Sequence, residues 1–140
     1  MKEDFYTLKG YHLKNHRVMS ASMEDYLEMI YRECSNSGFI RINLLAEKLH
    51  VKPSSASKMA QKLKETGYIS FTKYGVVVLT DAGEKYGEYL IYRHNVLNQF
   101  FCALNHSTSS LEEVEQIEHF ISKTSVENLE RLLSKMDSLT

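Results

Sequence analysis

The sequence has one proline, two cysteines and no tryptophan among its 140 residues, and it has no long hydrophobic run. Cys34 and Cys102 are too few and too far apart for a disulfide framework or a paired-cysteine metal knuckle. No apolar stretch approaches the roughly 18 residues that a membrane span needs, and the N-terminus MKEDFYTLKGYHLKNHR lacks the apolar core of a signal peptide. We therefore expect a cytoplasmic protein with no membrane partner.

The charge is nearly balanced over the whole chain, at a formal net value of -1, but it is divided along the sequence. Residues 36–74 carry seven basic and two acidic side chains, a net charge of +5. Residues 107–140 carry three basic and seven acidic side chains, a net charge of -4. A basic segment suits phosphate groups and an acidic segment suits cations, so the two ends of the chain predict different partners.

Apolar spacing predicts helices in the first half of the chain. The first helix, which ends near residues 36–38, has an apolar stripe of Met23, Tyr26, Leu27, Ile30 and Tyr31. After the short segment FIRI, the run INLLAEKLH predicts a short helix that Asn43 caps. A second helix, PSSASKMAQKLKE, begins at Pro53 and stops before Gly67. Two short helices joined by a tight break are typical of a helix-turn-helix.

A hairpin follows this pair of helices. The run YISFTKY alternates apolar and polar residues, Gly75 permits a turn, and VVVLT predicts the returning strand. A hairpin directly after a helix-turn-helix predicts a winged helix. Thr80 or Asp81 then caps a long helix that reaches about Leu104. Two further helices are expected at about residues 110–122 and 125–136.

The second helix of the pair is the candidate for DNA contact. Its first residues are small enough to approach base edges and phosphates, the lysines and glutamine that follow can reach the backbone or a base, and the wing tip can touch a neighbouring phosphate. The residues predicted to contact DNA are Pro53, Ser54, Ser55, Ser57, Lys58, Gln61, Lys62, Lys73 and Tyr74. A solvated helix face is the alternative, but the break, the hairpin and the basic segment together favour DNA binding.

The stretch VEQIEHF, residues 114–120, places Glu115, Glu118 and His119 beside an apolar stripe. At about 100° per residue from Val114, Glu118, Glu115 and His119 fall at about 40°, 100° and 140° on one side. The apolar residues on the other side are Ile117, Phe120 and Ile121. Taken alone, acids at this spacing are most often a solvated surface.

Three more polar residues are placed unusually. Asp25 and Glu28 lie away from the apolar stripe of the first helix, at about 200° and 140° from Met23. Glu28 and Arg32 have the spacing of a helical ion pair, worth about 0.2–0.5 kcal/mol. His94 lies within the apolar stripe of the long helix, where a hydrogen-bonded core histidine is the ordinary interpretation. Oxygens that face outward are also what a site shared with a second domain requires.

Several separated motifs resemble one known family. SMEDYLEMIY, VKPSSASKMAQKLKETGYI, KYGVVVLT, YRH and VEQIEH are similar to motifs of the manganese transport regulators of bacteria, a branch of the diphtheria-toxin-repressor family. The resemblance covers about residues 20–136. It implies a mainly α fold, with an N-terminal arm (1–19), a winged helix-turn-helix DNA-binding domain (20–80) and an all-helical domain for metal binding and dimerisation (81–140). It also implies no SH3-like third domain.

The resemblance further implies a set of metal ligands. Matched residue by residue, they are Asp25, Glu28, His94, Glu115, Glu118 and His119. Two ions are implied, with Glu28 and Glu118 as bridges, Asp25 and His94 completing one site, and Glu115 and His119 completing the other. Carboxylates and imidazoles suit Mn(II), and Fe(II), Zn(II), Co(II) and Cd(II) would also bind such a set in vitro.

The implied function is a Mn(II)-activated repressor of manganese-uptake genes. It would act as a homodimer on a palindromic operator whose half-sites lie about one helical turn, or a multiple of it, apart. Without metal, the four acids would repel one another and loosen the arrangement of the domains. Metal binding would order them.

Other functions remain open at this point. An Fe(II)-responsive regulator of the same family and a metal-independent winged-helix regulator both suit the sequence. A carboxylate-bridged di-metal enzyme needs Glu-x-x-His on two facing helices, and only Glu47 and His50 have that spacing, so we do not expect an enzyme. His12 and His16 of the arm are also spaced for a metal, although a solvated tail is the favoured interpretation.

Overall fold

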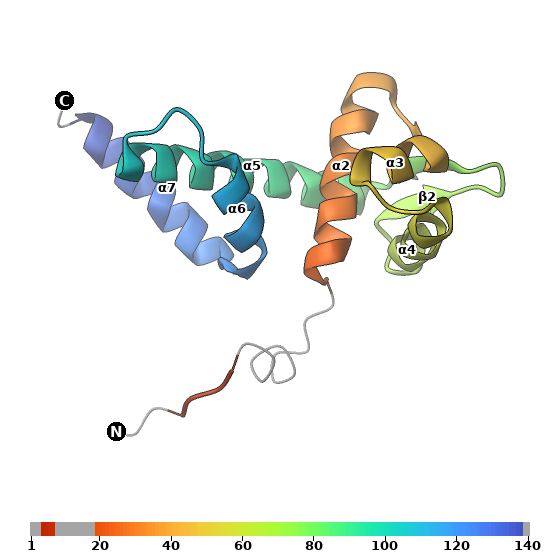
Figure 1. The fold of residues 1–140 in the computed structure, drawn as a ribbon, viewed down its shortest axis with the longest axis horizontal. Coiled ribbons are helices and arrows are strands. Elements are labelled where there is room, and N and C mark those ends of the chain that lie inside the picture. Colours follow the sequence, from red (N-terminus) through yellow and green to blue (C-terminus); the bar gives the residue numbers. More distant parts are fainter. Residues whose placement is uncertain (1–3, 8–18, 139–140) are drawn as a thin grey trace.

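The structure is a computed structural model that describes residues 4–7 and 19–138. The expected arm, with His12 and His16, therefore lies largely outside the described residues. The predicted mainly helical class is confirmed (Figure 1). The elements are α2 (Ala21–Ser37), β1 (Ile40–Arg41), α3 (Ile42–Leu49), α4 (Pro53–Glu65), β2 (Ile69–Phe71), β3 (Val76–Leu79), α5 (Asp81–Asn105), α6 (Leu111–Ile117), the 3-10 turn η1 (Glu118–Phe120) and α7 (Lys123–Ser138).

The described chain forms two groups of elements that share one long helix. In Figure 1, α2, α3, α4 and the strands lie at one end, α6 and α7 lie at the other, and α5 runs along both. Thr80 caps α5 as predicted, because its side chain accepts a hydrogen bond from the Gly83 backbone N–H at 3.1 Å. A rigid helix common to both groups can transmit a change at one end to the other.

The predicted helix-turn-helix is confirmed, and so are the end signals at Gly38 and Pro53. Ser20 caps α2 and Gly38 ends it with a left-handed φ of 85°. Pro53 occupies the first turn of α4. The predicted cap Asn43 is wrong, because α3 begins at Ile42, two residues earlier than a helix capped by Asn43 would, and its N-cap residue Arg41 makes no side-chain cap. Its first N–H, at Ile42, instead donates to the Gly75 carbonyl of the wing at 2.8 Å.

The wing has three strands in the order β1-β3-β2, one more than the sequence predicted. β2 and β3 form the expected hairpin, with Phe71 opposite Val77 and with Gly75 at a φ of 78° in the turn. The two residues of β1 pair antiparallel with β3, where Ile40 lies opposite Val77. The wing is therefore held by the segment that joins α2 to α3.

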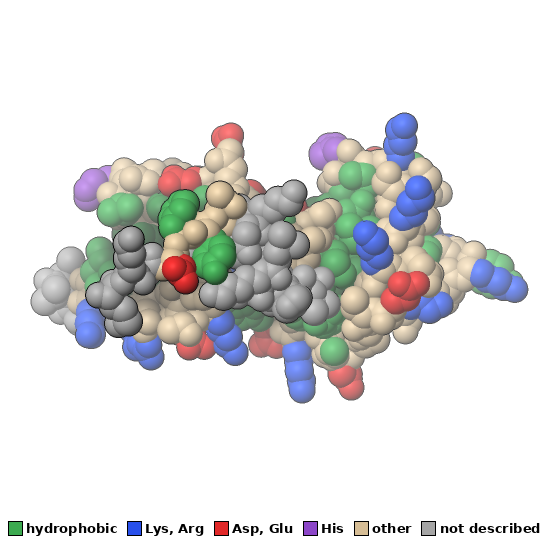
Figure 2. All heavy atoms as spheres, turned by 90° about the horizontal axis from the view of Figure 1, so that it is seen from below, with side chains coloured by type: hydrophobic (Ala, Val, Ile, Leu, Met, Phe, Trp, Pro, Cys, Tyr) green, Lys and Arg blue, Asp and Glu red, His purple; other side chains and the backbone are tan. Residues whose placement is uncertain are grey.

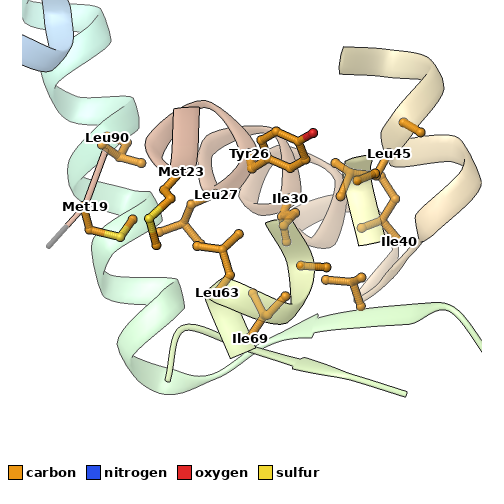
Figure 3. Close-up of a cluster of buried hydrophobic side chains, with 14 residues drawn as sticks. Met19, Met23, Tyr26, Leu27, Ile30, Ile40, Leu45, Leu63, Ile69 and Leu90 are labelled. Atoms are coloured by element: carbon orange, nitrogen blue, oxygen red, sulfur yellow. The ribbon is translucent and has the colours of Figure 1, made fainter. Parts of the chain in front are cut away.

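One core holds together the end that contains α2, α3, α4 and the strands. Buried side chains from α2, α3, α4, β2 and α5 meet in it (Figure 3). They include Met23, Leu27, Ile30, Leu45, Leu63, Ile69 and Leu90. Helix α5 approaches α2 closely at Gly87, where an added Cβ would lie 2.6 Å from the Tyr31 ring. This close approach fixes the angle at which α5 leaves the core.

The other end has a smaller buried core and more exposed apolar surface. Its buried apolar residues, among those that the structure describes, are Val96, Leu97, Val114 and Val126. Large apolar side chains of the same end remain exposed: Leu104, Leu111, Phe120, Leu132 and Met136. The helix expected over residues 110–122 ends as an α-helix at Ile117 and continues as the 3-10 turn η1. None of the helices among the described residues has the length and apolarity to cross a membrane.

Candidate metal centre

The six side chains that the resemblance singled out converge where the two ends of the molecule meet. Asp25 and Glu28 come from α2, His94 comes from α5, and Glu115, Glu118 and His119 come from α6 and η1. Ligand atoms of Glu28, His94, Glu115 and Glu118 all lie within 4.8 Å of one another, and so do those of Asp25, Glu118 and His119. Glu118 belongs to both groups, so it is the shared member of the cluster.

The side chains group differently from the division between two ions that the resemblance implied, and that division stays a prediction. Nδ1 of His94 lies 3.4 Å from Oε1 of Glu115 and 3.2 Å from Oε2 of Glu118. Nε2 of His119 lies 2.8 Å from Oδ1 of Asp25. His94 therefore belongs with Glu115, and His119 belongs with Asp25. The exchange arises because α6 sets Glu115 beside α5, whereas η1 carries His119 to α2.

The burial of Glu118 and His119 contradicts the interpretation of the polar residues of VEQIEHF as a solvated surface. Glu118 is 0% and His119 is 6% exposed, whereas Phe120, assigned to the apolar stripe, is 47% exposed. Glu118 and His119 are covered by neighbouring helices, Glu115 keeps a half-exposed side chain, and Phe120 faces outward. Helical periodicity gives the angles of these residues, but it does not tell which side of the helix a neighbouring helix covers.

The cluster fits a hard or borderline divalent cation. Among the described residues, Oε1 of Glu118 is fully buried and has no hydrogen-bond partner. Such a carboxylate oxygen is unfavourable unless a donor or a cation satisfies it. The two groups offer carboxylate oxygens and imidazole nitrogens and no thiolate, a donor set that suits Mn(II) and Fe(II).

Electrostatics at Glu28 show how closely the acids are placed. Burial, followed by the charge of Glu118, raises the pKa of Glu28 to about 6. Arg32 opposes this effect through the predicted ion pair, with Nη2 3.3 Å from Oε2 of Glu28. Glu28 is therefore a carboxylate that is costly to ionise and that a nearby cation would stabilise.

The two histidines already place positive charge among the acids. Hydrogen bonds with Glu115 and Glu118 raise the pKa of His94 to about 9, against an opposing effect of burial. Burial lowers the pKa of His119, but the hydrogen bonds to Asp25 and then Glu24 outweigh it and raise the pKa to about 9. Two imidazolium ions therefore offset part of the repulsion that was expected among the carboxylates without metal.

A buried network next to the cluster was missed by sequence reasoning. Glu24 accepts hydrogen bonds from the Tyr86 hydroxyl at 2.5 Å, from Nη2 of Arg93 at 3.3 Å and from Nδ1 of His119 at 2.8 Å. Burial, and then the hydrogen bond to Glu24, raise the pKa of Tyr86, which keeps this phenol a donor. A signal existed in the sequence, since Arg93 follows Leu90 by three residues within the apolar stripe of the long helix.

The residues predicted to contact DNA lie on an accessible face of the end that contains α4 and the wing. Pro53, Ser54, Ser55, Lys58, Gln61, Lys62, Lys73 and Tyr74 are exposed, and Ser57 is half-buried. On its opposite side, α4 buries Ala56, Ala60 and Leu63 in the core. Figure 2 shows Lys and Arg side chains spread over this end of the molecule. The structure thus leaves the predicted side of α4 and the wing tip free to meet a ligand.

The cluster of candidate ligands can be reached from solvent through a cavity of about 520 Å3. Its wall includes the ligand candidates Asp25, Glu28, His94 and Glu115 as well as Arg32 and Lys48. Lys48 also joins α3 to α2 through an ion pair with Glu33 at 2.9 Å. A solvated ion could therefore approach the cluster between the two ends of the molecule.

Two family models match the chain and together span nearly all of its described part. The iron dependent repressor N-terminal DNA binding domain matches residues 18–77, and the iron dependent repressor metal binding and dimerisation domain matches residues 80–138. The HTH-type transcriptional regulator MntR of Oceanobacillus iheyensis is 40% identical over 114 residues, which is 81% of this chain and 78% of the relative. The regulator of the same name from Lysinibacillus sphaericus is 40% identical over 83% of this chain and 84% of the relative.

Solved structures with the same fold include regulators that respond to metal. The manganese regulator SloR is 29% identical with a TM-score of 0.71, over 83% of this chain and 55% of that one. ScaR with bound Zn2+ is 29% identical with a TM-score of 0.68, over 80% of this chain and 53% of that one. The chain spans about half the length of these two proteins. With both family models matched, the chain belongs to the iron dependent repressor family, which joins a DNA-binding domain to a metal-binding and dimerisation domain.

Proposed function

We propose that the chain is a Mn(II)-activated DNA-binding repressor that controls manganese uptake and homeostasis. One observation carries the proposal, namely that carboxylates and imidazoles from the DNA-binding and dimerisation domains meet around the buried carboxylate of Glu118. The relatives named MntR, and the structural relative described as a manganese regulator, support manganese as the metal.

The proposed site holds two ions. Glu28, His94, Glu115 and Glu118 would hold one ion, and Asp25, Glu118 and His119 would hold the other. We propose Glu118 as the ligand common to both, because it alone belongs to both groups of atoms. Bridging by Glu28, which the resemblance implied, stays a prediction without support from this grouping, because Glu28 belongs to one group only.

The bound ions would supply positive charge at the contact between the domains. Asp25 and Glu28 would then hold α2 against α5, α6 and η1, where the remaining ligands lie. Because α2 packs in one core with α4, fixing α2 also fixes the direction in which α4 faces DNA. Metal binding would in this way favour one arrangement of two existing domains over others.

We propose that the regulator is a homodimer on a palindromic operator. The matched family domain is one of dimerisation. The exposed apolar side chains Leu104, Phe120, Leu132 and Met136 lie on the end with the smaller core, where a second copy would cover them. Two copies related by two-fold symmetry present two α4 helices to half-sites that repeat about every helical turn of DNA.

Fe(II) is the second candidate for the physiological metal. The same oxygen and nitrogen ligands bind Fe(II), which the general affinity order places above Mn(II) at equal concentration. The name of the matched family model also refers to iron. The named manganese relatives favour Mn(II), and a direct comparison of the two ions decides between them.

The test is a titration of DNA binding with Mn(II), Fe(II) and Zn(II) in parallel, with Fe(II) handled without oxygen and with a chelator as the zero point. We expect Mn(II) to tighten binding to a palindromic promoter fragment and Glu118→Gln to abolish this response. Glu113→Gln is the matched control, because Glu113 is an exposed acid of α6 outside both ligand groups. A response to Fe(II) alone would support the iron-responsive alternative, and DNA binding that ignores every metal would refute the proposal.

A further inference from the structure

Two consecutive acids of α2 hold both ring nitrogens of His119. Oε1 of Glu24 lies 2.8 Å from Nδ1, and Oδ1 of Asp25 lies 2.8 Å from Nε2. Asp25 is one of the proposed metal ligands, but Glu24 belongs to neither ligand group. Glu24 therefore contacts a proposed ligand through Nδ1, while the proposed ligand Asp25 lies at the other ring nitrogen, Nε2.

The Glu24 carboxylate is itself fixed. It is 2% exposed, and α5 supplies two donors to it, Tyr86 through its hydroxyl at 2.5 Å and Arg93 through Nη2 at 3.3 Å. Arg93 balances the charge of this buried carboxylate. A carboxylate that two other side chains hold in place can in turn determine the orientation of the imidazole that it contacts.

The contacts at Nδ1 assign its proton. Nδ1 of His119 lies 2.8 Å from Oε1 of Glu24 and 3.3 Å from Nη2 of Arg93. A carboxylate only accepts hydrogen bonds and a guanidinium only donates them. The shorter contact to the carboxylate makes Nδ1 a donor, and a neutral imidazole with its proton on Nδ1 presents its lone pair at Nε2.

We propose that Glu24 is a positioning residue of the metal centre, which accepts the Nδ1–H of His119 and thereby aims Nε2 at the ion shared with Asp25 and Glu118. This inference rests on the proposed function, because it requires that the cluster holds metal. Partners of this kind orient a ligating histidine, and their loss typically weakens metal binding about 10- to 100-fold. Since Glu24 lies on α2 and His119 on η1, the orientation of the ligand depends on the docking of the DNA-binding domain.

The first experiment counts ions bound by the folded, full-length chain in a Mn(II) titration followed by electron paramagnetic resonance. We expect Glu24→Ala to weaken one of the two ions about 10- to 100-fold and to change the other by less than about threefold. Glu24→Gln keeps an acceptor oxygen and should restore part of the lost affinity. Tyr86→Phe is the control, because it removes a contact to Glu24 without touching His119.

A purely structural role would give a different result. Glu24→Ala would then lower the melting temperature and leave both ion affinities unchanged, which would overturn the inference while the proposed function stands. If the wild-type chain bound no Mn(II) at all, the proposed function and this inference would fail together.

The second experiment needs no variant and so covers the case in which Glu24→Ala does not fold. Nitrogen-15 spectra of the Cd(II)-loaded wild-type chain report which ring nitrogen of His119 binds the metal. We expect a metal-bound Nε2 and a slowly exchanging proton on Nδ1. Metal bound at Nδ1 would overturn the assignment of Glu24.

Discussion

Protons should leave the protein when metal binds. The carboxylates around His94 and His119 raise the pKa of both histidines to about 9. A histidine must be neutral before it can ligate a metal ion. Mn(II) therefore has to displace a proton from each imidazole at neutral pH.

The size of this effect follows from the two pKa values. With a pKa of about 9, only about 1% of each imidazole is neutral at pH 7, so proton competition weakens each site about 100-fold. The apparent affinity for each ion should rise about tenfold per pH unit between about pH 6.5 and 8.5, and it should level off above about pH 9. Glu28, with a pKa of about 6, adds a further dependence below that pH.

Isothermal titration calorimetry measures the displaced protons directly. Mn(II) is titrated into the chain at pH 7 in buffers with different enthalpies of ionisation, and the slope of heat against ionisation enthalpy gives the number of protons. We expect about two protons per subunit, one from His94 and one from His119. Each single alanine variant of these histidines should remove about one. Binding that releases no proton and has the same affinity at pH 6.5 and 8.5 would refute the reasoning.

Three further predictions concern stability and DNA contact. The pKa values of His94 and His119 lie above the ordinary value of 6.5, so the two imidazolium groups stabilise the folded protein without metal fully below about pH 6.5, and this stabilisation is lost as the pH rises through about 9. Thermal melts with a chelator at pH 6.5 and pH 9 check this expectation, and a higher melting temperature at pH 9 would contradict it. Lys62→Ala should weaken binding to all DNA sequences alike and reduce the slope of log affinity against log salt by about 1, whereas an unchanged slope would place Lys62 off the backbone. Gly87→Ala should cost about 1–3 kcal/mol in urea unfolding because its Cβ meets the Tyr31 ring, and a fully stable variant would show that α2 and α5 are less closely packed.

The helix-turn-helix and the wing were predictable because their signals are local. Pro53, Gly38, Gly67 and Gly75 mark element ends through their own backbone preferences, and the structure places all three glycines at positive φ. Strand β1 and the true start of α3 were missed. Both depend on contacts with β3 and Gly75, more than thirty residues away, which local patterns do not contain.

The candidate site was much less predictable from periodicity. The angles placed Glu118 and His119 beside a stripe, and only the tertiary structure shows that α2 and α5 bury that side. The resemblance brought the six candidate ligands together, but it paired His94 with Asp25 and His119 with Glu115, whereas the structure sets His94 beside Glu115 and His119 beside Asp25. Their grouping depends on where η1 turns, and the sequence predicted a continuous α-helix there.

Glu24 is a second residue that sequence patterns could not identify as part of the site. Its neighbour Asp25 was found because it matches a ligand position, whereas Glu24 differs from a surface acid only through its contacts with α5 and η1. Arg93 carried a usable signal, since a charged residue within an apolar stripe needs a buried partner of opposite charge. A search for acids able to reach Arg93 would have led to Glu24.

The most direct test of metal-controlled DNA binding is a measurement of coupling in both directions. The affinity for a palindromic promoter fragment is measured with and without saturating Mn(II), and the affinity for Mn(II) is measured with and without that fragment. We expect the same factor in both experiments, because the coupling between two ligands is reciprocal, and we expect Glu118→Gln to reduce it to one. If Mn(II) binds the chain and each affinity is the same with and without the other ligand, the cluster between the domains does not control DNA binding.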